Sequence, residues 1–379
     1  MDLPDYDVVV IGAGPAGARV ARLLAESGRQ VQVFDAGSPQ REKLCGGLLN
    51  RRAQDLVSQW GGLPSGVRIG ATTPAMEFPA LEYHDRDNRI RARYTPGYRN
   101  INRQAFDAWL VDLARDSGAQ FCFNARVTAV EPQDGFVTLR AAGRSISAGW
   151  VVDASGGQAL TRRCLAGPAV RMLHSVQGTV ELNPAPDAMW GIYQTQYTPF
   201  FGWIIPKGDN RFLLGTGLTR PGIRRLRRGS TNDSGLNPSW QLLSPLLGYF
   251  SERGISYRII SEKPGGAPLT WPSGTNELWW GTGRLVVAGE ATGLVSPFSG
   301  EGISYALASA EAAAFAVVSG GGARRLPAML SPQRRRLTRA TYRAYVGMTP
   351  LLRPWGLLLL PFHARTPLTY LRWSSEAGH

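Results

Sequence analysis

The chain opens with two apolar runs separated by a segment of helical composition. Residues 7–11 form a β-branched run, residues 15–27 are rich in Ala, Leu and Arg, and residues 30–34 form a second apolar run. Short apolar runs bounded by turn residues predict buried strands, and the segment between them predicts an amphipathic helix. The N-terminus is therefore expected to fold as a strand, a helix and a second strand.

Similar apolar runs return later in the chain. Residues 149–153 lead into a turn of small residues, residues 283–290 end at an acid, and a helix is expected from about Gly302. Residues 121–123 alternate like a strand, which predicts that Cys122 is a core residue. The Arg-rich run at residues 224–230 lies in a polar stretch and predicts an exposed loop.

A dinucleotide-binding fingerprint fills the first turn, where Gly12, Gly14, Ala16 and Gly17 lie in the pattern Gly-x-Gly-x-Ala-Gly. The first glycine permits a tight turn, the second lets the backbone approach a pyrophosphate, and the third lets the helix pack on the strand. Free N–H groups at the helix N-terminus attract the anion. Asp35, about twenty residues further on, is placed to bind a ribose hydroxyl.

Two downstream segments favour FAD over NAD as the dinucleotide. A flavoprotein binds its permanent cofactor through the extreme N-terminus and needs contacts from two later strands as well. Asp153 ends the run at residues 149–153, and Gly289 and Glu290 end the later run. Glu290 is placed to bind the ribityl hydroxyls, and the helix that follows directs its N-terminus at the pyrimidine end of the flavin.

Composition adds information about partners. Lys and Arg total 42 against 28 Asp and Glu, a formal net charge of +14, and most of the cations are arginines, which favour phosphates and carboxylates. No nucleic-acid-binding motif accompanies this charge, so we expect no nucleic acid partner. An acidic membrane surface, a pyrophosphate-bearing substrate and an acidic protein partner remain open.

The cysteines and the chain ends add information about location. The 3 cysteines lie at irregular spacing, and no secretory signal precedes the first strand, which predicts a cytoplasmic protein with reduced thiols and no metal site. The apolar run at residues 355–362 is too short to span a bilayer. It suits a peripheral contact with a membrane and equally a cap over a substrate tunnel.

Four motifs carry a family resemblance. They are a Lys-x-Cys-Gly-Gly turn at residues 43–47, an Arg-x-x-Phe-Asp helix start at residues 103–107, a Tyr-x-Trp-x-Phe-Pro-like strand at residues 201–206, and a third flavin motif at residues 289–303. Phe201 and Ile205 replace Tyr and Phe, and Glu290 replaces the usual Asp. With these motifs the chain resembles the geranylgeranyl reductase family of flavoproteins and its CbrA-type members, within the class built like para-hydroxybenzoate hydroxylase.

The resemblance implies an α/β (α+β) fold. It places a Rossmann-like FAD-binding domain at residues 1–70, 97–158 and 264–325, a substrate domain with an antiparallel sheet at residues 71–96 and 159–263, and a helical C-terminal segment at residues 326–379. FAD is the expected cofactor, and NAD(P)H or another reductant is the transient electron donor. The residues expected to bind the cofactor are Gly12, Gly14, Ala16, Gly17, Asp35, Cys45, Gly46, Arg103, Asp153, Gly289, Glu290, Gly300, Gly302 and Ile303.

Cys45 and Trp203 are the candidate catalytic residues. Cys45 lies between Lys43 and two glycines, a setting that can lower a thiol pKa, and the resemblance implies that it handles substrate beside the flavin. Trp203 is expected above the flavin ring, where an aromatic wall excludes water. The expected substrate contacts are Phe201, Trp203, Pro206 and Pro297.

The reaction itself stays open between several hypotheses. The first is a reductase that transfers a hydride from flavin N5 to a carbon–carbon double bond of a hydrophobic, isoprenoid-like or lipid substrate, with Cys45 or water supplying the proton. The alternative is a flavin-dependent monooxygenase that hydroxylates an aromatic or lipid substrate, or an aromatic side chain of a partner protein. A redox-sensing flavoprotein without turnover is a further class.

Residues 201–206 also resemble the Trp-x-Trp-x-Ile-Pro signature of flavin-dependent halogenases. A halogenase needs a lysine near its substrate, and Lys43, Lys207 and Lys263 stand outside that family's sequence context. Halogenation therefore ranks below the other two reactions.

Overall fold

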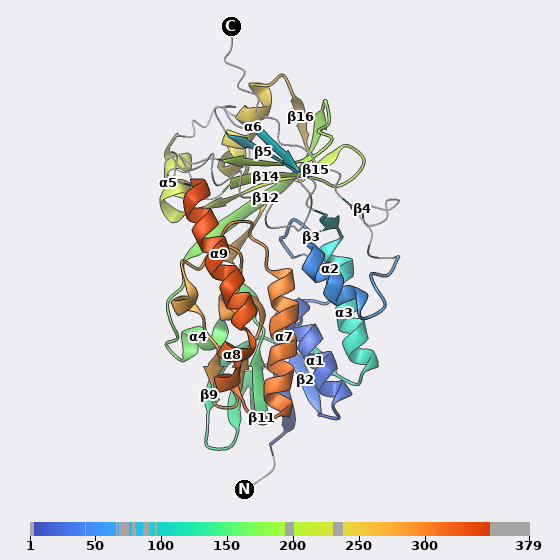
Figure 1. Cartoon of the computed structure of the whole chain (residues 1–379), viewed down its shortest axis with the longest axis vertical. Coiled ribbons are helices and arrows are strands. Elements are labelled where there is room, and N and C mark those ends of the chain that lie inside the picture. Colours follow the sequence, from blue (N-terminus) through green and yellow to red (C-terminus); the bar gives the residue numbers. More distant parts are fainter. Residues whose placement is uncertain are drawn as a thin grey trace.

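The computed structural model describes residues 4–41, 43–65, 67, 76–77, 81–85, 91–94, 97–193, 201–229 and 238–348. These residues form two lobes, and helix α9 (Ser331–Met348) runs alongside both of them (Figure 1). The apolar run at residues 355–362, expected to meet a membrane or cap a tunnel, lies outside the described residues.

The first lobe is built on a parallel sheet. Its strands lie in the order β8-β2-β1-β11-β19, and β18 continues the sheet antiparallel to β19. The chain adds strands on one side of β1 and then on the other, so the junction of β1 and β11 is the switch point at which ligands bind in such sheets. The strands are β1 (Tyr6–Ile11), β2 (Val31–Phe34), β8 (Gln120–Cys122), β11 (Arg144–Asp153), β18 (Gly281–Thr282) and β19 (Leu285–Val287).

Both faces of this sheet are covered, which explains why its strands are continuous apolar runs. Val8 and Val10 point to the helix side, whereas Val9 and Ile11 point to the opposite core. The helix side holds α1 (Pro15–Glu26), α3 (Arg103–Asp116) and α7 (Ile303–Val318) (Figure 1). The opposite side holds β9 (Val127–Pro132), β10 (Val137–Ala141) and α4 (Leu160–Cys164).

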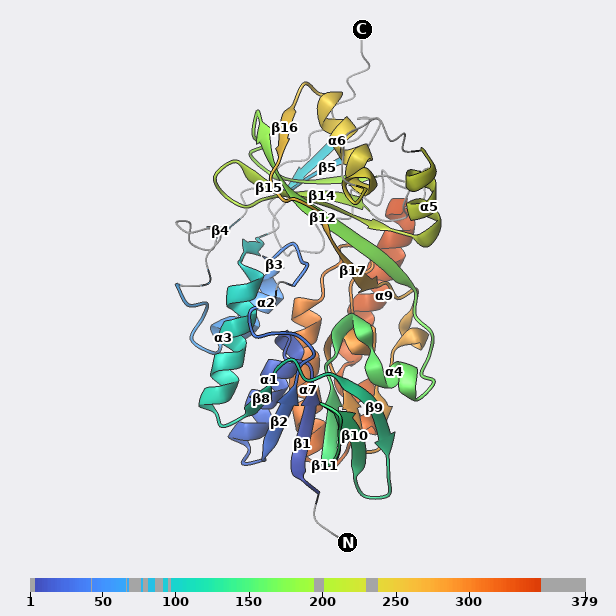
Figure 2. The same ribbon diagram turned by 180° about the vertical axis from the view of Figure 1, so that it is seen from behind.

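The second lobe is a largely antiparallel sheet in the order β16-β12-β15-β14-β13-β5-β6, with β17 also paired to β12 (Figure 2). One face packs on the helical segments at residues 240–251, where Trp240 and Phe250 are fully buried. The strands are β5 (Leu81–Asp85), β6 (Arg91–Tyr94), β12 (Met172–Asn183), β13 (Met189–Tyr193), β14 (Phe201–Pro206), β15 (Arg211–Leu218), β16 (Ser256–Ile259) and β17 (Gly265–Thr270).

Smaller elements complete the two lobes. A short sheet, β3-β7-β4, lies beside α2 between the lobes. Its members and the remaining helices are β3 (Leu48–Leu49), β4 (Met76–Glu77), β7 (Arg99–Asn100), α2 (Arg51–Ser58), α5 (Arg220–Gly229), α6 (Ser244–Ser251) and α8 (Leu326–Met329).

The expected α/β (α+β) class is confirmed, while the domain boundaries stay a prediction. The loop predicted at residues 224–230 is wrong for residues 224–229, which belong to helix α5, although the arginines of this run are exposed as predicted; residue 230 lies outside the described residues. Ile223 and Leu226 lie one turn apart and pack into the core of the second lobe, and their spacing makes the segment amphipathic. Cys122 ends β8 and is half-buried rather than a full core residue. No described helix is both long and apolar enough to cross a membrane.

Candidate functional site

A cavity of about 520 Å³ lies where the two lobes face each other. The first lobe contributes the loops that follow β1, β2 and β11, the start of α3 and the loop that leads into α7. The second lobe contributes residues of β12, β13, β14 and β17. The volume is within the usual range of a small-molecule site.

The glycine turn after β1 has the shape that a dinucleotide needs. Gly12 has a φ of +101°, and a Cβ there would lie 2.5 Å from the carbonyl oxygen of Ala154. A Cβ on Gly17 would lie 1.8 Å from the carbonyl oxygen of Gly12. A Cβ on Gly14 would instead meet nothing nearer than the Arg41 guanidinium, at 3.7 Å, and no side chain caps α1. The N-terminal N–H groups of α1 are therefore open to a pyrophosphate.

Asp35 follows β2 at the cavity wall, and the chain fixes its orientation. Its Oδ2 accepts a hydrogen bond from Ala13 N at 2.6 Å, and its Oδ1 accepts one from Gly37 N at 2.8 Å. Arg41 Nη2 lies 3.5 Å from Oδ2. Each carboxylate oxygen keeps capacity to accept a further bond, as binding of a ribose hydroxyl requires.

The opposite side of the cavity is formed by the segment before α7. Gly289 and Glu290 lie in a short 3₁₀ turn, and Glu290 Oε1 accepts a hydrogen bond from Thr270 N at 3.0 Å. Gly302 is the N-cap of α7 and forms no side-chain cap. Gly300, Gly302 and Ile303 line the cavity, so the N-terminus of α7 faces it.

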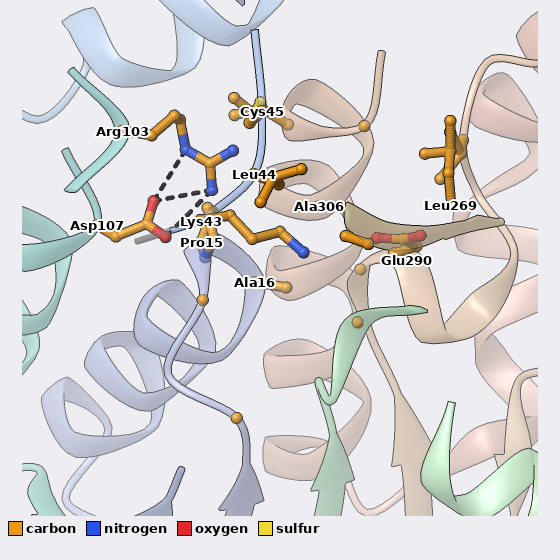
Figure 3. Close-up of a pocket in the computed structure, with 18 of the residues that line it drawn as sticks. Pro15, Ala16, Lys43, Leu44, Cys45, Arg103, Asp107, Leu269, Glu290 and Ala306 are labelled. Atoms are coloured by element: carbon orange, nitrogen blue, oxygen red, sulfur yellow. Dashed lines mark hydrogen bonds and ion pairs between the residues drawn. The ribbon is translucent and has the colours of Figure 1, made fainter. Parts of the chain in front are cut away.

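Cys45 lies beside a buried arginine at the same wall. The Arg103 guanidinium lies between the Asp107 carboxylate and Cys45, with Nη2 3.0 Å from Asp107 Oδ1 (Figure 3). Gly47 N donates to Cys45 Sγ at 3.4 Å. Burial raises the pKa of the thiol. Arg103, the Gly47 N–H and Lys43 together lower it by more than burial raises it, so the pKa of Cys45 falls below its ordinary value. Burial alone would lower the pKa of the Arg103 guanidinium, but the Asp107 carboxylate beside it raises that pKa above its ordinary value.

A half-buried lysine holds the Cys45 turn in place. Lys207 Nζ donates to Gly46 O and to Asn100 Oδ1, both at 2.7 Å. Burial lowers the pKa of Lys207 to about 8, although Cys45 opposes this shift. The backbone of Gly47 is left-handed, with a φ of +69°. Ile101 N donates to its carbonyl oxygen at 2.8 Å, so both sides of the turn are anchored.

The sheet of the second lobe forms an apolar roof over the cavity. Met189, Phe201, Trp203 and Ile205 line it from β13 and β14. The Phe201 and Trp203 rings meet edge to face, with centroids 6.3 Å apart. Such a wall excludes water from the bound cofactor and substrate.

Most residues expected at the site lie together in the cavity wall, and four do not. Gly17, Asp153, Pro206 and Pro297 are outside it. The Asp153 carboxylate instead accepts bonds from Ser155 N, Thr161 N and Thr161 Oγ1, at 2.9, 2.8 and 2.6 Å. Asp153 therefore positions the turn at residues 154–156, which does line the cavity. The individual roles assigned to these residues stay predictions.

Several residues of the site had no role in the sequence analysis. Asp107 follows Arg103 by one helical turn, which is a usable signal for an ion pair. Lys207 follows β14 directly, but its contact with the distant Gly46 carbonyl could not be foreseen. Ser175 and Gln177 alternate with Val176 on β12, and the strand pattern alone does not say which face meets the cavity.

Comparisons with known proteins agree with this geometry. Residues 5–192 match the model of the FAD binding domain family. Protein CbrA of Escherichia coli O9:H4 (strain HS) is 31% identical over 320 residues, which cover 81% of this chain and 80% of that protein. This match confirms the resemblance to the CbrA type.

Solved structures share the fold, and two of them serve as examples. The geranylgeranyl bacteriochlorophyll reductase-like protein of Thermoplasma acidophilum has a TM-score of 0.70 at 18% identity, covering 98% of this chain and 94% of that one. The p-nitrophenol 4-monooxygenase PnpA of Pseudomonas putida DLL-E4 has a TM-score of 0.64 at 16% identity, covering 95% and 94%. At these identities the likeness concerns the fold alone.

Proposed function

Because the chain belongs to the family of the CbrA proteins and is an FAD-dependent oxidoreductase, we propose that it reduces carbon–carbon double bonds of a hydrophobic, isoprenoid-like substrate. Reduced FAD supplies the hydride in such a reaction. The remaining requirements fall on the chain: it must bind the cofactor and the substrate in contact, exclude water, and deliver one proton to the second carbon.

The cofactor fits the wall formed by the first lobe. The N-terminus of α1 and Gly14 would hold the pyrophosphate, Asp35 a ribose, and Glu290 with the N-terminus of α7 the flavin end. NAD(P)H, which is typical of the family with the FAD binding domain, or another reductant would reduce the flavin.

The observation that carries the proposal is the placement of Cys45. Its thiol lies in the cavity wall beneath an apolar roof, and its pKa is lowered toward the range in which a thiol can both give and regain a proton near neutral pH. In the proposed step, two electrons and a hydrogen reach one carbon, the Cys45 proton reaches the other, and solvent reprotonates the thiolate. Arg103 and Gly47 N–H stabilise that thiolate until it is reprotonated.

Monooxygenation remains the second candidate. The aromatic roof at Phe201 and Trp203 that protects a reductase from water would also serve a hydroxylase, and a p-nitrophenol monooxygenase shares the fold. Halogenation has less support. The amine of Lys207 is bonded to Gly46 O and Asn100 Oδ1, and Lys207 is not part of the described cavity wall. Lys43 does line the cavity, but it comes from the first lobe, where the cofactor would bind.

Stopped-flow reoxidation without oxygen tests the proposal. The holoenzyme is reduced, freed of oxygen and mixed with geranylgeraniol, and the flavin absorbance is followed. We expect reoxidation that depends on the substrate, and a rate about a hundredfold lower in Cys45→Ser, since a positioned acid contributes roughly this factor. Cys164→Ser, a change at an exposed free cysteine, is the matched control. An unchanged rate in Cys45→Ser would remove Cys45 from the mechanism.

A further inference from the structure

One row of residues crosses the cavity face of the second sheet and contains alternating glycines. Gly265 of β17 pairs with Gln177 of β12, Gln177 pairs with Gly215 of β15, and Gly215 pairs with Trp203 of β14. A Cβ on Gly215 would lie 2.4 Å from Trp203 Nε1, so the indole lies over this glycine. The indole therefore extends from β14 across β15, in the direction of Gln177.

Gln177 brings a polar group into this row. The residue is only 8% exposed, and it lines the cavity. Within the described residues its amide forms no hydrogen bond to the protein, and neither does the hydroxyl of Ser175, which lines the same wall two residues earlier. Neither group is among the described polar atoms that are fully buried without a partner, so both are accessible from the cavity and free to bond to a ligand there. These two groups are thus placed to bind something that enters the cavity.

The charges around this position restrict what they bind. The described wall residues of the second-lobe strands are Ser175, Gln177, Met189, Phe201, Trp203, Ile205, Ala267, Pro268 and Leu269, and none is charged. The cations of the wall, such as Arg41, Lys43 and Arg103, all come from the first lobe. An ionised phosphate or carboxylate here would lose its hydration without gaining a counter-charge, which is costly. A neutral oxygen needs no counter-charge, so its transfer to this position costs much less.

We propose that Gln177, with Ser175, binds a neutral oxygen of the substrate, a hydroxyl or a carbonyl, while the apolar roof binds its hydrocarbon part. This inference rests on the proposed function for the hydrophobic character of the substrate. It makes the substrate an uncharged oxygenated lipid rather than a diphosphate ester. A primary amide both donates and accepts, so it suits either oxygen group.

Binding to the oxidised holoenzyme tests this without turnover. Flavin fluorescence is titrated with farnesol, farnesal, farnesyl diphosphate and the hydrocarbon farnesene. We expect the alcohol or the aldehyde to bind most tightly. Gln177→Leu should weaken that probe about tenfold, the value of one neutral hydrogen bond, and leave farnesene unchanged. Thr179→Val, on the same strand but outside the wall, is the control and should change nothing.

A second variant tests whether a neutral hydrogen-bonding group is enough. In this uncharged wall, burial raises the pKa of a carboxyl, so Gln177→Glu should be neutral. A neutral carboxyl donates and accepts as the amide does, so this variant should keep the affinity for farnesol and farnesal that Gln177→Leu loses. The inference is overturned if Gln177→Leu weakens farnesene as much as the oxygenated probes, if the diphosphate binds most tightly, or if none of the four binds. Should the binding pattern hold while none of the probes reoxidises the reduced enzyme, the proposed reaction fails and this inference stands.

Discussion

At the scale of single residues, charge distinguishes Cys45 from the other cysteines. Cys122 is half-buried and Cys164 is exposed, whereas Cys45 alone among the three contacts a buried guanidinium and receives a backbone N–H bond. These contacts favour the thiolate over the thiol. The consequence is a pH dependence that can be measured directly.

Alkylation by iodoacetamide reports this dependence, because the thiolate is the reacting form. A lowered pKa populates the thiolate at lower pH, so half-maximal alkylation of Cys45 should occur below the pH of a free cysteine. Arg103→Met removes a cation and a donor and should move the profile to higher pH. Lys43→Met should move it less in the same direction. Peptide mass spectrometry after timed labelling gives the profile, and a profile that neither variant moves would contradict this account.

At the scale of elements, the roof depends on a glycine opposite its tryptophan. Trp203 and Gly215 are paired across β14 and β15, and any side chain on Gly215 would collide with a rigid indole ring. Gly266 on β17 is different, since a Cβ there would meet only the Ser175 carbonyl oxygen at 3.8 Å, an ordinary contact. The two glycines form a matched pair within one sheet.

Gly215→Ala should therefore displace Trp203 and destabilise the protein by about 1–3 kcal/mol, the usual cost of overpacking. Gly266→Ala should lower the free energy of unfolding much less than Gly215→Ala does. Urea unfolding gives the free energies, and tryptophan emission reports the displaced ring. Equal effects of the two variants would show that the Gly215 contact is unimportant.

The elements also show what a sequence can and cannot predict. The strand, glycine turn and helix at residues 6–26 were predictable because their signals are local: apolar runs, a Gly-x-Gly-x-Ala-Gly spacing and a closing acid. Helix α5 was mistaken for a loop because its apolar residues, Ile223 and Leu226, are few among arginines. Gln177 went unnoticed because its role depends on the strand register that sets it beside Gly215.

At the scale of the whole molecule, the two lobes contribute different kinds of residue to the cavity wall. The first lobe supplies every charged residue of the described cavity wall, and the second lobe supplies an uncharged roof. Charges therefore lie where a pyrophosphate and riboses bind, and apolar groups lie where a lipid would enter. The proposed reaction requires this division, because it needs an anionic cofactor and a hydrophobic substrate in one cavity.

In the proposed reaction, this cavity brings reduced FAD and a carbon–carbon double bond together for hydride transfer. Mass spectrometry of the product is the decisive experiment. The holoenzyme is incubated with NADPH and geranylgeraniol under ¹⁸O₂, and the product mass is compared with that of the substrate. We expect a gain of two hydrogens for each bond reduced and no ¹⁸O. A product that carries one ¹⁸O atom and keeps all its double bonds would contradict it and identify a monooxygenase.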